Sequence, residues 1–124
     1  KTVDGKYVCF SHSGKKITKA EPGSVARELQ ERGAGEILIT SIDRDGTMKG
    51  YDIDLIHKVT RSVSIPVIAS GGAGSYKHFK EAIVDGGASA VAAASLFHFT
   101  EQTPEEAKNF LKNNGIAIRS SFNE

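Results

Sequence analysis

The sequence of 124 residues has little of three features that would each point to a particular class of protein. Its only cysteine, Cys9, cannot form an internal disulfide, so we expect a cytoplasmic protein rather than a secreted one. Its 16 basic and 15 acidic residues give a net charge of +1. This balance lacks the excess of positive charge that is typical of proteins binding nucleic acid or an anionic membrane. No apolar run approaches the roughly 20 residues of a membrane span, and the first residues lack the apolar stretch of a signal peptide.

The remaining composition is that of an ordinary folded chain. Hydrophobic residues make up 39% and charged residues 25%, and this composition excludes a mainly disordered chain. The length fits one domain, or part of a larger one. The 13 glycines are clustered, which indicates functional turns rather than a flexible linker.

Three short and almost wholly apolar runs alternate with helical patterns. These runs are Glu36–Thr40, Ile65–Ala69 and Ala88–Ala94. Because they show no polar alternation, we predict strands of a parallel sheet that is buried on both faces. Each run is followed by a loop and a helix, so the fold class is α/β, built from βα units.

Four helices are predicted from their start signals and apolar spacing. Pro22 stands where a first helical residue is expected. Asp52 and Ser75 are predicted N-caps, and Thr103–Glu106 has the pattern of a capping box.

The first twenty residues are predicted to hold one strand and one loop. Lys6–Phe10 is β-prone and Ser11–Lys19 is polar. Cys9, within the strand, is expected to be an inert core thiol. Lys15 and Lys16 are either solvated or, because their loop lies on the presumed ligand side, in contact with a substrate.

The glycine-rich loops all follow the carboxyl ends of the predicted strands, which is where ligands bind in parallel α/β folds. In the loop Ser70–Gly74, glycines let backbone N–H groups approach an anion, and the next helix adds its N-terminal dipole. Ala94–His98 follows the third strand and can form one helical turn facing that loop. Either loop alone is also compatible with an ordinary tight turn, but together they predict a phosphate site.

The loop Asp43–Thr47 carries a candidate catalytic carboxylate. Asp45 stands at the carboxyl end of a strand, where general acid–base catalysis can use it, although Asp43 or Asp45 can instead bond to its own turn. A calcium loop counted from Asp43 requires glycine where Met48 stands, so we expect no metal.

The histidines are not expected to be catalytic. His57 and His78 lie on predicted helices among charged neighbours and are expected to be solvated. His98 lies beside the predicted phosphate turn, where we expect it to contribute packing.

These motifs together resemble a known family. The sequence is similar to the cyclase subunit of imidazole glycerol phosphate synthase in Ser13–Lys16, Gly33–Thr47, Gly50–Asp52, Ile68–Gly74 and Ala93–Phe99. The resemblance covers nearly the whole chain. That family is a (β/α)8 barrel, which needs roughly 200 residues or more. The resemblance therefore implies that residues 1–124 form a single half-barrel, the C-terminal half in the region of strands five to eight.

The resemblance also implies an activity. With ammonia from a partner glutaminase, the family converts a phosphorylated ribulosyl-formimino aminoimidazole carboxamide ribonucleotide into imidazole glycerol phosphate and an aminoimidazole carboxamide ribotide, in histidine biosynthesis. It uses no cofactor. The family's two catalytic aspartates, on the first strand and at the end of the fifth, fall outside this chain, so the chain alone is expected to be inactive. Half of a closed barrel is expected to leave two sheet edges unpaired and one face of its central strands exposed, so the isolated half-barrel is predicted to associate with itself.

Individual residues of this chain match functional positions of the family. The matches to its phosphate-binding loops are Gly71, Gly72, Ala94 and Ser95. The matches to its polar active-site positions are Thr40, Asp45 and Ser70. Glu36 matches a charged residue at the amino-terminal mouth of the barrel, where ammonia enters. Ser11 and His12 depart from the family, which often has an aromatic residue or threonine there.

Two other functions stay open. One is a related cyclase-like subunit that works with a glutaminase-like partner in the amidation of a surface-polysaccharide sugar. The other is a non-catalytic half-barrel that binds phosphate, which the missing aspartates favour. The pair Thr40-Ser41 and the loop Ser13–Lys16 favour histidine biosynthesis.

Overall fold

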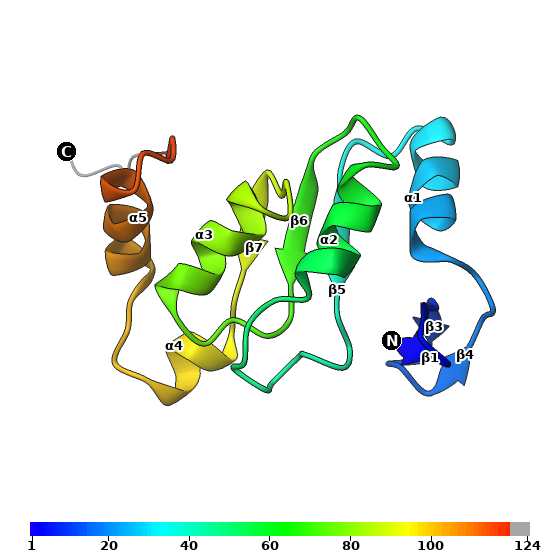
Figure 1. The fold of residues 1–124 in the computed structure, drawn as a ribbon, viewed down its shortest axis with the longest axis horizontal. Helices are drawn as coiled ribbons and strands as arrows, with labels where there is room; N and C mark the ends of the chain where they lie inside the picture. The colour runs from blue at the N-terminus through cyan, green and yellow to red at the C-terminus, as the bar shows by residue number, and fades with distance from the viewer. Residues whose placement is uncertain (120–124) are drawn as a thin grey trace.

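The fold is a row of βα units, described for residues 1–119 by a computed structural model (Figure 1). A parallel sheet has the strand order β5-β6-β7, formed by β5 (Ile37–Thr40), β6 (Val67–Ser70) and β7 (Ala90–Ala92). The helices are α1 (Pro22–Glu31), α2 (Ile53–Thr60), α3 (Tyr76–Val84), α4 (Ser95–Phe99) and α5 (Pro104–Asn113). The predicted α/β class and its parallel βα units are confirmed.

Helices cover one face of the sheet and leave the other face open. Val67 and Ala69 of β6 point toward the helices and are buried. On the other face, Leu38 lies beside Ile68, and Leu38 exposes 61% of its surface. The prediction from the apolar pattern that these strands are buried on both faces is therefore wrong, whereas the exposed face expected of half a barrel is present. Within residues 1–119, β5 and β7 each have a strand neighbour on one side only, so both outer edges of the sheet lack a strand partner there.

The N-terminal segment differs from the single strand and loop predicted for it. It forms two small antiparallel pairs, β1 (Thr2–Val3) with β2 (Lys6–Tyr7) and β3 (Phe10–Ser11) with β4 (Lys16–Ile17). The predicted strand is divided between β2 and β3, and the predicted polar loop contains β4. Each of these strands has two residues, one polar and one apolar or aromatic, which is too short to show a period-2 alternation in the sequence.

The four predicted helix starts are confirmed in position. Pro22 opens α1, and the Asp52 carboxylate accepts the N–H of Leu55 at 3.1 Å as the N-cap of α2. Thr103 and Glu106 form the capping box of α5. Ser75 is the N-cap residue of α3 by position, but its side chain makes no capping hydrogen bond. Another group must therefore serve the amino end of α3.

Side-chain bonds attach the N-terminal pairs to the βα row. The Tyr7 hydroxyl donates to Asp52 at 2.7 Å, and its pKa is raised by burial and by this carboxylate. The N–H of Thr2 donates to the Asp43 carboxylate at 2.7 Å. Both acceptors lie between β5 and α2, so the pairs are held at the carboxyl side of the sheet.

At the other end of the molecule, α3 and α5 are joined by one tyrosine. The Tyr76 hydroxyl donates to Glu106 at 2.6 Å and accepts the N–H of Thr103 at 3.0 Å. The bond from Tyr76 lowers the pKa of the Glu106 carboxyl. Tyr76 thus fixes the start of α5 beside the start of α3.

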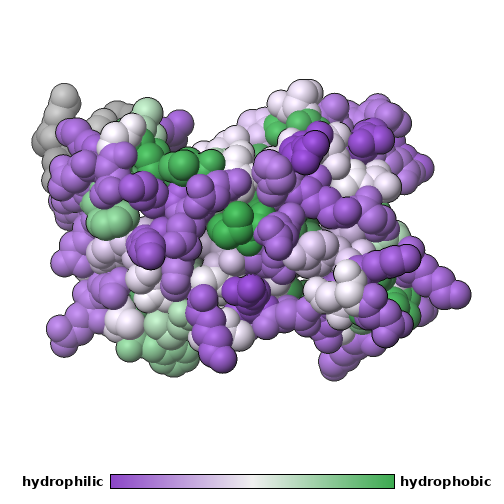
Figure 2. Space-filling view, in the orientation of Figure 1, coloured by the Kyte–Doolittle hydropathy of each residue, from purple (hydrophilic) through white to green (hydrophobic). Residues whose placement is uncertain are grey.

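The outer surface has the polarity expected from the composition. Figure 2 shows a largely hydrophilic face on which hydrophobic residues form separate patches. Among residues 1–119, no helix has both the length and the apolar character needed to cross a membrane.

Candidate functional site

The candidate site is a cavity of about 150 Å³ at the carboxyl ends of β6 and β7. Its lining includes six predicted site residues, which are Asp45, Ser70, Gly71, Gly72, Ala94 and Ser95. Gly46 and three alanines complete it. The loop after β6 and helix α4 therefore meet as predicted, and Figure 1 shows both at the edge toward which β6 points.

Close backbone contacts hold the loop after β6 against the loop after β5. The N–H of Gly50 donates to the carbonyl oxygen of Gly72 at 2.7 Å, and the N–H of Ser41 donates to that of Ser70 at 3.1 Å. A side-chain carbon on Gly72 would overlap the carbonyl oxygen of Gly50, and one on Gly74 would overlap that of Met48. Glycine is needed here because the two backbones touch.

The cavity presents backbone donors. Among residues 1–119, the N–H groups of Gly71 and Gly72 donate to no protein acceptor. Ser95 is the first residue of α4, and the first N–H groups of a helix have no partner within that helix. Unpaired N–H groups and a helix N-terminus are the combination that binds phosphate oxygens.

Hydrophobic contacts hold α4 in this position. Leu96 is fully buried in the core, and the ring centroid of Phe97 lies 6.2 Å from that of Phe79 on α3. The five residues of α4 would be marginal as an isolated helix. Packing of these two side chains therefore keeps the amino end of α4 at the cavity.

The other predicted polar residues lie around the cavity. Thr40 does not line it but pairs in register with Ser70, on the open face of the sheet. Glu36 is exposed just before β5, at the opposite end of the sheet from the cavity. This placement is compatible with the separate role predicted for Glu36.

Among residues 1–119, Asp45 is the only carboxylate that lines the cavity. Its N–H donates to the carbonyl oxygen of Ser41 at 2.9 Å, so the turn after β5 fixes its backbone. A carboxylate repels a phosphate and accepts hydrogen bonds. We therefore expect Asp45 to contact a neutral or cationic part of a ligand rather than its phosphate. Within residues 1–119, no group of three or more His, Cys, Asp or Glu residues is arranged to hold a metal ion.

The remaining candidates lie away from the cavity. Lys15 and Lys16 are exposed at the β3–β4 turn and do not line it. His98 is exposed on α4, so the packing role predicted for it is wrong. Cys9 is half-buried and lies outside any strand, and burial raises the pKa of its thiol.

Solvated side chains were predicted for His57 and His78, and the prediction is confirmed for His57 only. His57 is exposed on α2. His78 is half-buried, and its Nδ1 accepts the N–H of Gly74 at 3.0 Å. The prediction for His78 is wrong because its helix begins directly after a loop whose N–H group needs an acceptor.

Sequence reasoning assigned no role to Tyr51, which bonds to the lining of the cavity. Its hydroxyl donates to the carbonyl oxygen of Ala92, a lining residue, at 2.7 Å. Tyr51 is 3% exposed, and burial raises the pKa of its hydroxyl. The available signal was its place in the stretch Gly50–Asp52 that resembles the family.

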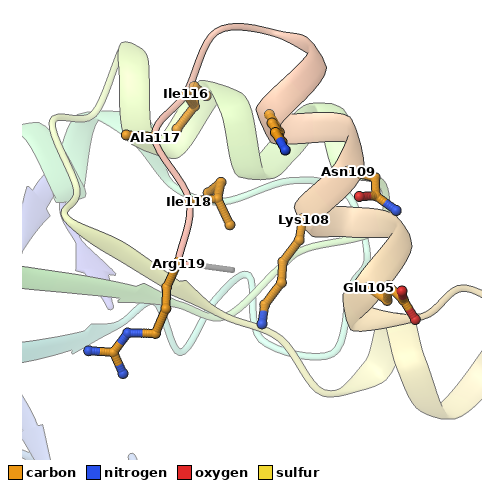
Figure 3. A pocket seen from close by; sticks show the side chains of 8 residues that line it. Glu105, Lys108, Asn109, Ile116, Ala117, Ile118 and Arg119 are labelled. Carbon is orange, nitrogen blue, oxygen red and sulfur yellow. The ribbon is translucent and has the colours of Figure 1, made fainter. Parts of the chain in front are cut away.

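Two larger cavities lie at the other end of the sheet row, near the C-terminal segment. One of about 370 Å³ lies between α5 and residues 116–119, where Lys108 and Arg119 extend along the same side (Figure 3). The other, of about 560 Å³, borders the free edge of β7. Neither is lined by a predicted site residue, so they are not the candidate site.

Comparison with known proteins agrees with this geometry. The family model described as "Histidine biosynthesis protein" matches residues 2–103. The chain is 51% identical over 119 residues to "Imidazole glycerol phosphate synthase subunit HisF" of Chlorobium phaeobacteroides, covering 96% of this chain and 47% of that relative. The protein of the same name from Hyphomonas neptunium is 51% identical over 120 residues, covering 97% and 48%. The chain thus spans about half the length of the curated relatives that it matches.

The contact between the two loops predicts that Gly72→Ala is more damaging than an ordinary glycine substitution. Gly33→Ala is the matched control, because Gly33 also has a positive φ but has open space around it. We expect Gly33→Ala to lower the free energy of unfolding by about 1–2 kcal/mol through φ strain. Gly72→Ala should lose about 1–3 kcal/mol more, because its side chain meets a backbone carbonyl. Urea denaturation of both variants measures the difference, and equal losses would contradict the backbone contact.

Proposed function

Because the chain belongs to the histidine biosynthesis protein family, we propose that it supplies one phosphate-binding half of the active site of an imidazole glycerol phosphate synthase cyclase subunit. The observation that carries this proposal is the cavity between the loop after β6 and the start of α4. Its unpaired N–H groups suit one terminal phosphate of a substrate that carries a phosphate at each end.

Residues at the rim of the cavity are proposed to contact the rest of the substrate. Asp45 lies close enough to Gly71 that a side-chain carbon on this glycine would be 3.4 Å from the Asp45 Cβ. A ligand phosphate held by Gly71 therefore has the Asp45 carboxylate beside it, which can accept a proton or a hydrogen bond from the adjoining group. Thr40 and Ser70 extend the polar surface along the open face of the sheet.

The open face supports the proposal that residues 1–124 are one half of a barrel. In a closed barrel the face that carries Leu38 and Ile68 is the interior, which is filled by side chains from all strands. The family's two catalytic aspartates belong to the part of the barrel outside this chain. The same division places the second phosphate site there.

The partner is proposed to be a glutaminase that delivers ammonia at the end of the sheet where Glu36 lies. This end is opposite the cavity, so ammonia would pass along the open face, past Leu38, toward Thr40 and Ser70. The names of the relatives favour histidine biosynthesis over sugar amidation, since they are called subunits of imidazole glycerol phosphate synthase. A cytoplasmic location, suggested by the single cysteine, stays a prediction.

The first test of this function is phosphate binding. Titration of the 15N-labelled chain with inorganic phosphate should shift the amide signals of Gly71, Gly72 and Ser95 most. Ser95→Asp should weaken binding about tenfold or more, because charges about 4 Å apart repel by about 1–4 kcal/mol near a protein surface. Ser89→Asp is the control, with the same charge change at the amino end of β7. Shifts confined to Lys15 and Lys16 would place the anion elsewhere.

The second test is catalysis. The chain alone should give no ammonia-dependent turnover, because each positioned acid or base contributes about 10²–10⁴-fold and the aspartates are absent. A chimera that adds the unmatched part of the Chlorobium phaeobacteroides relative to this chain should restore turnover. Ser95→Asp in the chimera should reduce it and Ser89→Asp should not. A folded but inactive chimera contradicts the proposed function, and an active isolated chain contradicts the half-site assignment.

The third test is assembly of the isolated chain. An apolar open face and two free strand edges favour pairing with a second copy, so we expect a dimer in sedimentation velocity at micromolar concentration. Leu38→Lys should shift the chain toward monomer, because it places a charge on the open face. Leu29→Lys, which adds the same charge to an exposed position on α1, should not. A wild-type chain that stays a stable monomer contradicts the half-barrel proposal.

A further inference from the structure

His78 lies where the amino end of α3 meets the two loops of the site. Its Nδ1 accepts the N–H of Gly74 at 3.0 Å, one residue before the N-cap Ser75. The Ser75 side chain makes no capping bond, so His78 supplies an acceptor from within the first turn of the helix. The bond ties the last glycine of the loop after β6 to α3.

The same imidazole ring also lies beside the loop after β5. A side-chain carbon added to Gly50 would lie 3.4 Å from both Cδ2 and Nε2 of His78, so the ring occupies the space next to this glycine. Gly50 is the residue whose N–H donates to the carbonyl oxygen of Gly72 at 2.7 Å. One side chain therefore bonds to the loop after β6 and lies next to the hydrogen bond that joins the two loops.

We propose that His78 is a positioning residue, which holds Gly72 and Gly74 in the conformation that presents the loop's N–H groups to phosphate. The proposal rests on the proposed function for the phosphate, but the ordering of the loops by His78 is testable without it. The bond requires Nδ1 to be unprotonated, so His78 is the neutral tautomer with its proton on Nε2. His78 is not among the residues that line the cavity.

A capping role alone would affect the helix and not the ligand. Loss of the Gly74 bond would then loosen α3 while leaving Gly72 and Gly50 in place. If His78 positions the loop, the N–H groups of Gly72 and Gly50 must become more mobile as well, and phosphate affinity must fall.

Two variants of His78 and one control separate these cases. His78→Leu keeps the bulk and removes the acceptor, whereas His78→Asn places an amide oxygen near the position of Nδ1. His57→Asn makes the same change at an exposed helical histidine. The measurements are amide hydrogen exchange at Gly50 and Gly74, whose N–H groups donate to the Gly72 carbonyl oxygen and to His78, and the affinity for inorganic phosphate by 15N NMR.

We expect His78→Leu to weaken phosphate binding about 2–13-fold, the equivalent of one hydrogen bond of about 0.5–1.5 kcal/mol. Exchange at Gly50, whose N–H donates to the carbonyl oxygen of Gly72, should accelerate by a similar factor. His78→Asn should recover most of both losses, and His57→Asn should match the wild type. Unchanged exchange at Gly50 in His78→Leu, or equal losses in both His78 variants, would overturn the proposal.

A measurement on the wild type protects the test against variants that fail to fold. An N–H···N bond transmits a scalar coupling between its two nitrogens, so Gly74 N and His78 Nδ1 should show one. Its absence in the folded chain would overturn the proposal. A wild type that shows this coupling and the expected exchange pattern but binds no phosphate contradicts the proposed function while supporting the role of His78 in ordering the loops.

Discussion

The direct contact between the backbones of two loops is the constraint on which the rest of the site depends. The loops after β5 and β6 approach until Gly72 meets the carbonyl oxygen of Gly50. No side chain fits between them, so glycine is required where it stands. Gly71 and Gly72 both line the cavity, and within residues 1–119 their N–H groups donate to no protein acceptor, while Asp45 lies on the same lining. The geometry of the site thus follows from how closely the backbones of these two loops pack.

The second constraint is the one-sided sheet. Helices α1, α2 and α3 bury the face that carries Val67 and Ala69, while the face with Leu38 and Ile68 stays open. Thr40 and Ser70 stand on that open face beside the cavity. The surface proposed for the substrate is therefore continuous with the surface proposed for the other half of a barrel. Under this proposal, catalysis and closure of the barrel depend on the same face.

Much of the fold and site was predictable because the relevant signals are local. Pro22, Asp52 and the Thr103–Glu106 pair mark helix starts through bonds within one turn of the helix. The meeting of the loop after β6 with α4 follows from a general rule, since carboxyl ends of neighbouring parallel strands share one edge. The small N-terminal pairs were missed because strands of two residues are too short to show an alternation.

By itself, the sequence determined the α/β class, the order of the elements and the chemistry of the cavity lining, because apolar periodicity, caps and glycine clusters act over a few residues. Only the tertiary structure decided what depends on contacts between distant segments. It decided which face of the sheet is open, since the helices pack on the face that carries Val67 and Ala69 and leave Leu38 exposed on the other. It placed the ring of His78 against Gly50 and gave it the N–H of Gly74, although the sequence predicted a solvated side chain. The reason is that the sequence around a helical histidine does not reveal which distant loop lies against it.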